Sequence, residues 1–113
     1  MTSANMVAVG QGTNSIAYST DNGATWTGSN NGNSIFSSDG IGVAWNGSRW
    51  VAVGAGSTNT IAYSDDNGIN WTGLGTSIFS TSASGVAWNA TDDRWVAVGN
   101  GTNSIAYSDN GIN

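Results

Sequence analysis

Short apolar segments alternate with polar turns along the whole chain. Within a segment, a large apolar residue alternates with alanine, as in Val51-Ala52-Val53 and Val43-Ala44-Trp45. A strand that is exposed on one side would show polar residues at every second position, and these segments do not. Clusters of Gly, Asn, Ser and Asp separate them, which favours tight turns. The pattern predicts short β-strands buried on both faces.

The segments recur with a constant period. Val-Ala-Val-Gly starts at positions 7, 51 and 96, and Ile-Ala-Tyr-Ser starts at positions 16, 61 and 105. The spacings are therefore 44 or 45 residues. Gly-Val-Ala-Trp-Asn also occurs twice, at 42–46 and 85–89. Periods of about 20–50 residues are typical of propellers and solenoids.

One full period predicts four strands, A to D, joined as hairpins. The predicted ranges are 42–46 for A, 49–54 for B, about 60–64 for C and about 70–73 for D, followed by a connector that contains 77–80. Four such strands make one propeller blade. The repeats span about 5–40, 41–83 and 84–113, where the first lacks strand A and the third lacks strand D. We expect an all-β chain, a β-propeller of four-stranded antiparallel blades that is incomplete in one chain.

Two and a half blades leave flat apolar faces and strand edges uncovered. Such a partial propeller is not stable as an open monomer, because each repeat buries its faces only against neighbours. We therefore expect the chain to bind copies of itself and to close a ring as a homo-oligomer, a dimer or a trimer.

Composition and charge exclude several functions. The chain contains no Lys, Glu, His, Cys or Pro, one Leu and one Gln, and its net charge is −5. The scarcity of Leu, Glu and Lys argues against helices. Two cations cannot neutralise several phosphates, so a nucleic-acid partner is not expected. No apolar run approaches the ~20 residues of a membrane span. Neither a metal nor another cofactor is expected, since most of their usual ligands are missing.

A second recurring element is an Asp-containing turn between strands C and D. Ser19-x-Asp21-x-Gly23-x-Thr25-Trp26 is repeated at 64–71, with Asn70 at the Thr position. An Asp carboxylate accepts backbone N–H groups within such a turn, and Gly provides the positive φ that closes it. We interpret these turns as structural. Their predicted residues are Ser19, Asp21, Gly23, Trp26, Ser64, Asp66, Gly68, Trp71, Ser108, Asp109 and Gly111.

This turn resembles the Asp-box, or BNR repeat, of sialidase-type β-propellers and of related propellers in photosystem II assembly factors and sortilin-like receptors. The repeats that carry the resemblance cover nearly all of the chain. In that family the boxes are structural and lie away from the active site. Sialidases use an arginine triad, a Tyr nucleophile assisted by Glu, and an Asp acid/base. This chain has no Glu, and Arg49 and Arg94 occupy equivalent positions of two repeats. We predict that it is not an enzyme; a sialidase-like glycosidase is a remote alternative.

A recurring aromatic and polar group at the A–B turns is the candidate ligand site. Aromatic faces beside Asn, Asp and Arg can stack on a sugar and bind its hydroxyls, so a glycan is the ligand class that the group favours. In the alternative interpretation, the Trp residues fill the core and each Arg bridges to an Asp. The candidates are Trp45, Asn46, Arg49, Trp50, Trp88, Asn89, Arg94 and Trp95.

The sequence therefore predicts a non-catalytic, self-assembling scaffold or binding module with multivalent recognition of a carbohydrate or another surface. The alternative is a purely structural fragment, natural or engineered, of a larger Asp-box propeller. The sequence gives no indication of the cellular compartment.

Overall fold

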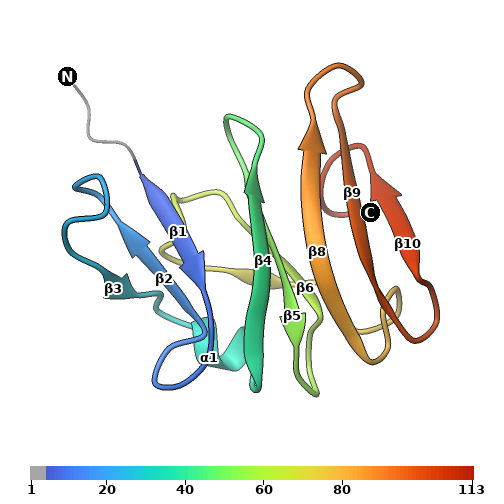
Figure 1. Cartoon of the computed structure of the whole chain (residues 1–113), viewed down its shortest axis with the longest axis horizontal. Coiled ribbons are helices and arrows are strands. Elements are labelled where there is room, and N and C mark those ends of the chain that lie inside the picture. Colours follow the sequence, from blue (N-terminus) through green and yellow to red (C-terminus); the bar gives the residue numbers. More distant parts are fainter. Residues whose placement is uncertain (1–4) are drawn as a thin grey trace.

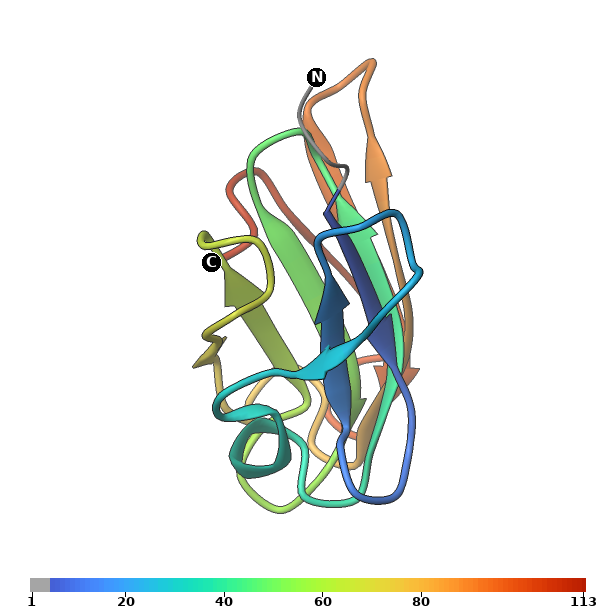
Figure 2. The same ribbon diagram turned by 90° about the vertical axis from the view of Figure 1, so that its left-hand side faces the viewer.

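The computed structural model describes residues 5–113, which form an all-β antiparallel protein (Figure 1). A small sheet has the strand order β1-β2-β3, and a larger seven-stranded sheet curls into a half-barrel. The body is flat, with extents of 42 × 35 × 17 Å, as the side view in Figure 2 shows. The elements are β1 (Met6–Val9), β2 (Ile16–Ser19), β3 (Thr27–Gly28), α1 (Gly32–Ile35), β4 (Asp39–Trp45), β5 (Trp50–Ala55), β6 (Ile61–Ser64), β7 (Thr72–Gly73), β8 (Ser82–Asn89), β9 (Arg94–Asn100) and β10 (Ile105–Ser108).

The strands form three antiparallel units that lie side by side (Figure 1). Unit 1 is β1–β3, unit 2 is β4–β7 and unit 3 is β8–β10, and consecutive strands pair within each unit. Units 2 and 3 belong to one sheet through the pair Ala55 and Ser82. The predicted order A-B-C-D is therefore the pairing order in unit 2. The described residues do not close into a ring, so a closed propeller stays a prediction about several copies.

The three units share one register. Ala8 pairs with Ala17, and the equivalent pairs in units 2 and 3 are again two alanines. Since side chains alternate across a strand, each unit has an alanine face and an opposite bulky face. The alanine faces contain Ala8 and Ala17, Ala52 and Ala62, and Ala97 and Ala106. The bulky faces contain Val7, Val9, Ile16 and Tyr18; Val51, Val53, Ile61 and Tyr63; and Val96, Val98, Ile105 and Tyr107.

The core lies between the units, where a bulky face meets an alanine face. Ile16 of unit 1 is buried in one cluster with Ala52 and Ala62 of unit 2. Val53 of unit 2 is buried in a second cluster against Ala97 and Ala106 of unit 3. Alanine allows the two sheets to approach closely, so the alternation of large and small residues sets the stacking of the units.

The elements differ from the prediction at several places. β4 begins at Asp39 rather than at residue 42, and β5 lies one residue later than the predicted 49–54. The predicted D strand began at residue 70, whereas β7 begins at Thr72, because Asn70 belongs to the preceding turn. The connector between units 1 and 2 forms one helical turn, α1, although the composition argued against helices. This turn buries Ile35 and Phe36 in the first cluster. Tertiary burial of two apolar side chains thus outweighs weak local propensity.

Candidate functional site

The first Asp turn is a closed set of hydrogen bonds around one carboxylate. Asp21 Oδ1 accepts from the Thr25 amide at 2.9 Å and from the Ser19 hydroxyl at 2.8 Å. Asp21 Oδ2 accepts from the Thr25 hydroxyl at 2.6 Å. The Gly23 amide donates to Ser19 Oγ, and the Trp26 indole N–H donates to the Gly23 carbonyl. Every residue that the motif specifies therefore has a partner within the turn.

The second turn repeats this geometry with one exchange. Asp66 accepts from the backbone amide of Asn70 and from its side-chain amide, each at 2.9 Å, so Asn70 takes the part of Thr25. In both turns an Asn and the following Gly have positive φ, 66° and 85° at Asn67 and Gly68. Asn and Gly adopt this conformation at low cost, which explains the recurring Asn-Gly pair.

The third turn has a different hydrogen-bond acceptor from the predicted one. Asp109 was expected to hold this turn, but Asn110 Oδ1 accepts the amides of Ile112 and Asn113 at 2.8 and 2.9 Å. Asp109 instead pairs with Arg94 at 2.9 Å. The third turn is one residue shorter, so the residue directly before Gly111 occupies the acceptor position. Asp109 thereby corresponds to Asp65 of the second turn rather than to its box carboxylate.

Hydrogen bonds keep the box carboxylates ionised. The side-chain and backbone bonds from Thr25, together with the bond from Ser19, lower the pKa of Asp21 to about 2. For Asp66, desolvation is the largest single influence and raises the pKa, but the bonds from Asn70 and Ser64 together outweigh it and lower the pKa. A carboxylate with a lowered pKa is a poor general acid. Both groups are built to accept hydrogen bonds within their turns.

The candidate Trp residues form one pair in each of units 2 and 3. The ring centroids of Trp45 and Trp50 are 4.9 Å apart, as are those of Trp88 and Trp95. Trp50 and Trp95 lie inward, and their buried indole N–H groups have no hydrogen-bond partner among residues 5–113. These two rings therefore act as apolar packing. Trp45 is 39% exposed and is the member of its pair that a ligand can reach.

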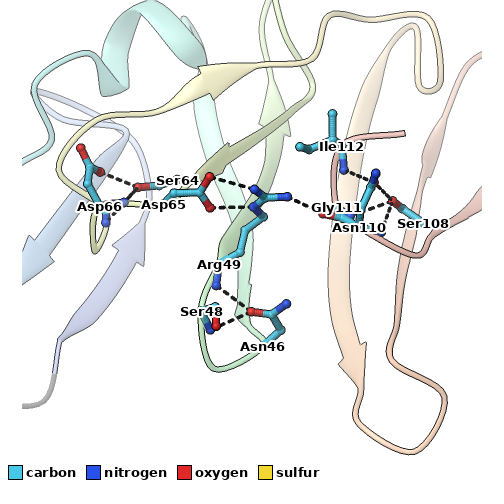
Figure 3. A network of polar contacts seen from close by, with 11 residues as sticks. Asn46, Ser48, Arg49, Ser64, Asp65, Asp66, Ser108, Asn110, Gly111 and Ile112 are labelled. Atoms are coloured by element: carbon cyan, nitrogen blue, oxygen red, sulfur yellow. Dashed lines mark hydrogen bonds and ion pairs between the residues drawn. The ribbon is translucent and has the colours of Figure 1, made fainter.

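The Arg residues are held by the neighbouring Asp turns. Arg49 forms a bidentate pair with Asp65, with N–O distances of 2.6 and 2.8 Å (Figure 3). Its third nitrogen donates to the Asn110 carbonyl of unit 3 at 2.6 Å. The guanidinium also lies 4.7 Å from the Tyr63 ring centroid. The bonds from Arg49 lower the pKa of Asp65. The alternative interpretation, in which each Arg bridges to an Asp, describes this geometry.

The amides of the A–B turns are also engaged within the chain. Asn46 Oδ1 accepts the amides of Ser48 and Arg49 at 2.9 and 2.6 Å (Figure 3). Asn89 accepts the Thr91 amide and donates to Asp92. The structure thus brings all candidate ligand residues of one unit to the same end of that unit, but most of their polar side-chain groups are engaged by neighbouring Asp residues and turn backbone.

Sequence reasoning missed a polar clasp between units 1 and 2. Asn31 accepts the Trp71 amide at 2.9 Å and donates to the Trp71 carbonyl at 2.7 Å. The Ser29 hydroxyl donates to the Gly68 carbonyl at 2.5 Å. The sequence signal was one of length: the connector from Gly28 to Gly42 is two residues longer than the equivalent one from Gly73 to Gly85. The clasp fixes the second Asp turn against unit 1 and buries Trp71 to 4% exposure.

No protein-family model, curated protein or solved structure matches this chain. Within residues 5–113, no group of three or more His, Cys, Asp or Glu residues is arranged to hold a metal ion. The described part of the chain also has no helix that is long and apolar enough to cross a membrane.

Proposed function

We propose that this chain is a non-catalytic scaffold that associates with copies of itself, head to tail, through its sheet faces. The observation that carries the proposal is the exposed bulky face of unit 3. Ile105 and Tyr107 are 69% and 65% exposed, and Val96 and Val98 about 40%. The equivalent Val51 and Val53 of unit 2 are 3% and 0% exposed. Monomeric proteins rarely expose a contiguous apolar patch of this kind.

The alanine face of unit 1 is the matching surface. Ala8 is exposed, whereas the equivalent Ala52 is fully buried. Both contacts between units inside the chain place a bulky face on the alanine face of the following unit. The same rule applied between molecules places unit 3 of one copy on unit 1 of the next. Repetition of this contact stacks the units as blades, and closure of the ring gives the Asp-box propeller expected from the repeats.

The first Asp turn supports the same arrangement. A side-chain carbon at Gly68 would meet Val7 of unit 1, and one at Gly111 would meet Val51 of unit 2, so these turns lie against the preceding unit. A side-chain carbon at Gly23 would meet Met6 and Trp26, which belong to unit 1 itself. In the proposed assembly, the Val96 face of a neighbouring copy covers this turn and the exposed Trp26.

A mixing experiment tests the head-to-tail contact. Ile105→Asp places a charge on the bulky face, and Ala8→Asp places one on the alanine face. Each variant alone should sediment as a monomer, while the wild type sediments as a dimer or a larger ring. An equimolar mixture should form a heterodimer, because each variant retains one intact face. Thr91→Asp, which adds the same charge in the exposed β8–β9 loop, should assemble like the wild type.

A monomeric wild type, or variants that assemble unchanged, would overturn the proposal. A wild type that stays monomeric and folded would favour the alternative, a structural fragment whose faces are covered by other blades of a longer chain. Assembly of one variant on its own would indicate a symmetric contact through its intact face, and variants that stay monomeric when mixed would contradict the pairing of these two faces. Circular dichroism of each variant separates loss of assembly from loss of fold.

A second candidate function is carbohydrate recognition, favoured by the exposed ring of Trp45 beside Asn46 and Arg49. A ring assembly would repeat this group and provide multivalent binding. A glycan array probed with wild type and with the Trp45→Ala/Trp88→Ala double variant tests it. Binding that disappears in the variant supports the site, and binding that persists excludes these residues.

A further inference from the structure

A cavity of about 290 Å³ lies between units 2 and 3. This volume is about ten times the ~30 Å³ that one water molecule occupies in the liquid. The walls are mostly apolar and come from the bulky face of unit 2, the alanine face of unit 3 and the connector between them. The third Asp turn, with Gly111 and Ile112, forms one side of the cavity.

The corresponding space between units 1 and 2 is filled by Trp71. This indole is 4% exposed and belongs to a cluster whose members have repeat equivalents in the cavity wall. The equivalent pairs are Ile16 and Ile61, Ile35 and Ile78, Ala52 and Ala97, and Ala62 and Ala106. The cavity is therefore the position of an indole that no residue of the described chain occupies in unit 3.

A free strand edge runs beside the cavity. In units 1 and 2, the third strand of the A–D order pairs with a two-residue Thr-Gly strand: β2 with β3, and β6 with β7. In unit 3, β10 pairs with β9, and no described strand covers its other edge. The uncovered positions are Ala106 and Tyr107, which correspond to Ala62 and Tyr63.

We propose that this edge and cavity form a binding site for an extended peptide segment containing Trp-Thr-Gly. The indole enters the cavity, the Thr pairs with Tyr107 and the Gly pairs with Ala106, which adds a strand to the sheet. The inference is independent of head-to-tail association, because the cavity lies between two units of one chain. It assigns a peptide ligand to a site whose wall includes Trp95 but none of the other candidate Trp and Arg residues.

Two differences from the first interface shape the expected affinity. The Trp71 indole N–H donates to the Ser29 hydroxyl at 3.3 Å, and Leu74 occupies the equivalent position beside the cavity, so this acceptor is missing there. The Gly111 carbonyl remains at the position of Gly68, whose carbonyl accepts the Trp71 indole N–H at 3.0 Å. Binding thus depends mainly on burial of the ring, and tryptophan is the side chain that the peptide cannot lose.

The test uses a synthetic peptide with the sequence of residues 68–75, carrying 5-fluorotryptophan, added to the full-length chain. Fluorine NMR should show saturable binding, and the amide signals of Ala106 and Tyr107 should shift. The same peptide with alanine in place of tryptophan carries no fluorine, so its binding is followed by the amide signals of Ala106 and Tyr107. It should bind at least about tenfold more weakly, a difference of about 1.4 kcal/mol. Ala106→Leu, which fills the cavity, should weaken binding to a similar extent.

Ala17→Leu is the matched control, because Ala17 is the equivalent position of unit 1 and lies outside the cavity. It should leave peptide binding unchanged. Ile105→Asp should also retain binding, since Ile105 points away from the cavity; a failure of assembly and a failure of peptide binding are thereby read separately. Absence of saturable binding, or equal binding by wild type and Ala106→Leu, would overturn the proposal.

Discussion

The contact between units 1 and 2 and the contact between units 2 and 3 have the same framework but different contents. Both place a bulky face on an alanine face. The first contains the buried Trp71 and the clasp from Ser29 and Asn31. The second contains a cavity of about 290 Å³, and its Asp turn is held by a bond from Arg49. Stacking of the faces therefore does not require the indole.

The comparison separates two contributions to the stability of a repeat protein. The alternation of large and small apolar residues sets which faces meet, and it is identical in all three units. The indole and the connector fill the remaining space, and they vary between units. Because stability in repeat proteins is approximately a sum over neighbouring contacts, each contact can be altered separately. Substitutions at equivalent positions of the two contacts can therefore be compared directly.

Removal of the indole from the first contact should have the largest effect. Trp71→Ala should lower the free energy of unfolding by about 3–5 kcal/mol, because it leaves a cavity in a closed cluster. Trp26→Ala is the control: Trp26 is 43% exposed, so the change should stay within about 1 kcal/mol for the monomer. Urea unfolding at low protein concentration measures both. Equal losses would show that Trp71 does not fill the contact.

A larger side chain in the cavity of the second contact should stabilise the chain, whereas the same change in the filled first contact should destabilise it. Ala106→Leu inserts methylene groups into the cavity and should stabilise the chain by about 1 kcal/mol. Ala62→Leu makes the same change where Trp71 already occupies the space, and should destabilise by about 1–3 kcal/mol. Thermal unfolding of the two variants decides the matter. A loss of stability in both would mean that the second contact has no usable space.

The sequence predicts the strands and faces of these contacts but not the side chains that fill the space between them. The 44–45-residue period and the Val-Ala-Val alternation specify which strands pair and which faces are small, and the structure has both. The clasp from Asn31 was not predictable, because it joins residues 40 positions apart through a connector of irregular length. The short helix α1 was also not predictable, because burial of Phe36, rather than local sequence, decides its conformation.

The Asp turns show a finer limit of sequence reasoning. Their residue types predict a self-contained hydrogen-bonded turn, which Asp21 and Asp66 form. In the third turn, residue type and the distance from Gly111 both select Asp109, whereas the distance from Ser108 selects Asn110, which is the acceptor. Backbone geometry decides, because the acceptor must reach the amides that follow the glycine. An amide oxygen serves as well as a carboxylate for this purpose.

Acid should therefore open the first two turns and spare the third. The lowered pKa of Asp21, about 2 against about 3.9 unfolded, means that its stabilisation is present above pH ~4 and lost as the pH falls through ~2. Asn110 does not titrate. The Thr25 amide signal in NMR should shift with a midpoint near pH 2, while the Ile112 amide signal should not. A Thr25 midpoint near pH 4, or a matching Ile112 transition, would contradict the assignment.

Removal of either ion pair should have the smallest effect on stability. The loss should be larger for Arg49 than for Arg94. Arg49 binds both Asp65 and the turn of unit 3, and its side chain is 22% exposed, so Arg49→Ala should cost about 1 kcal/mol. Arg94 pairs with Asp109 in a more exposed setting, and Arg94→Ala should cost less.

Arg49→Lys distinguishes charge from geometry, since lysine keeps the charge but lacks the planar fork that binds Asp65 through two nitrogens and Asn110 through the third. If the fork joins units 2 and 3, the lysine variant should resemble Arg49→Ala in urea unfolding. Its loss should also persist at about 1 M salt, where charge attraction between exposed groups is screened. A lysine variant as stable as the wild type would reduce Arg49 to an ordinary surface charge. The second contact would then depend on its apolar faces alone.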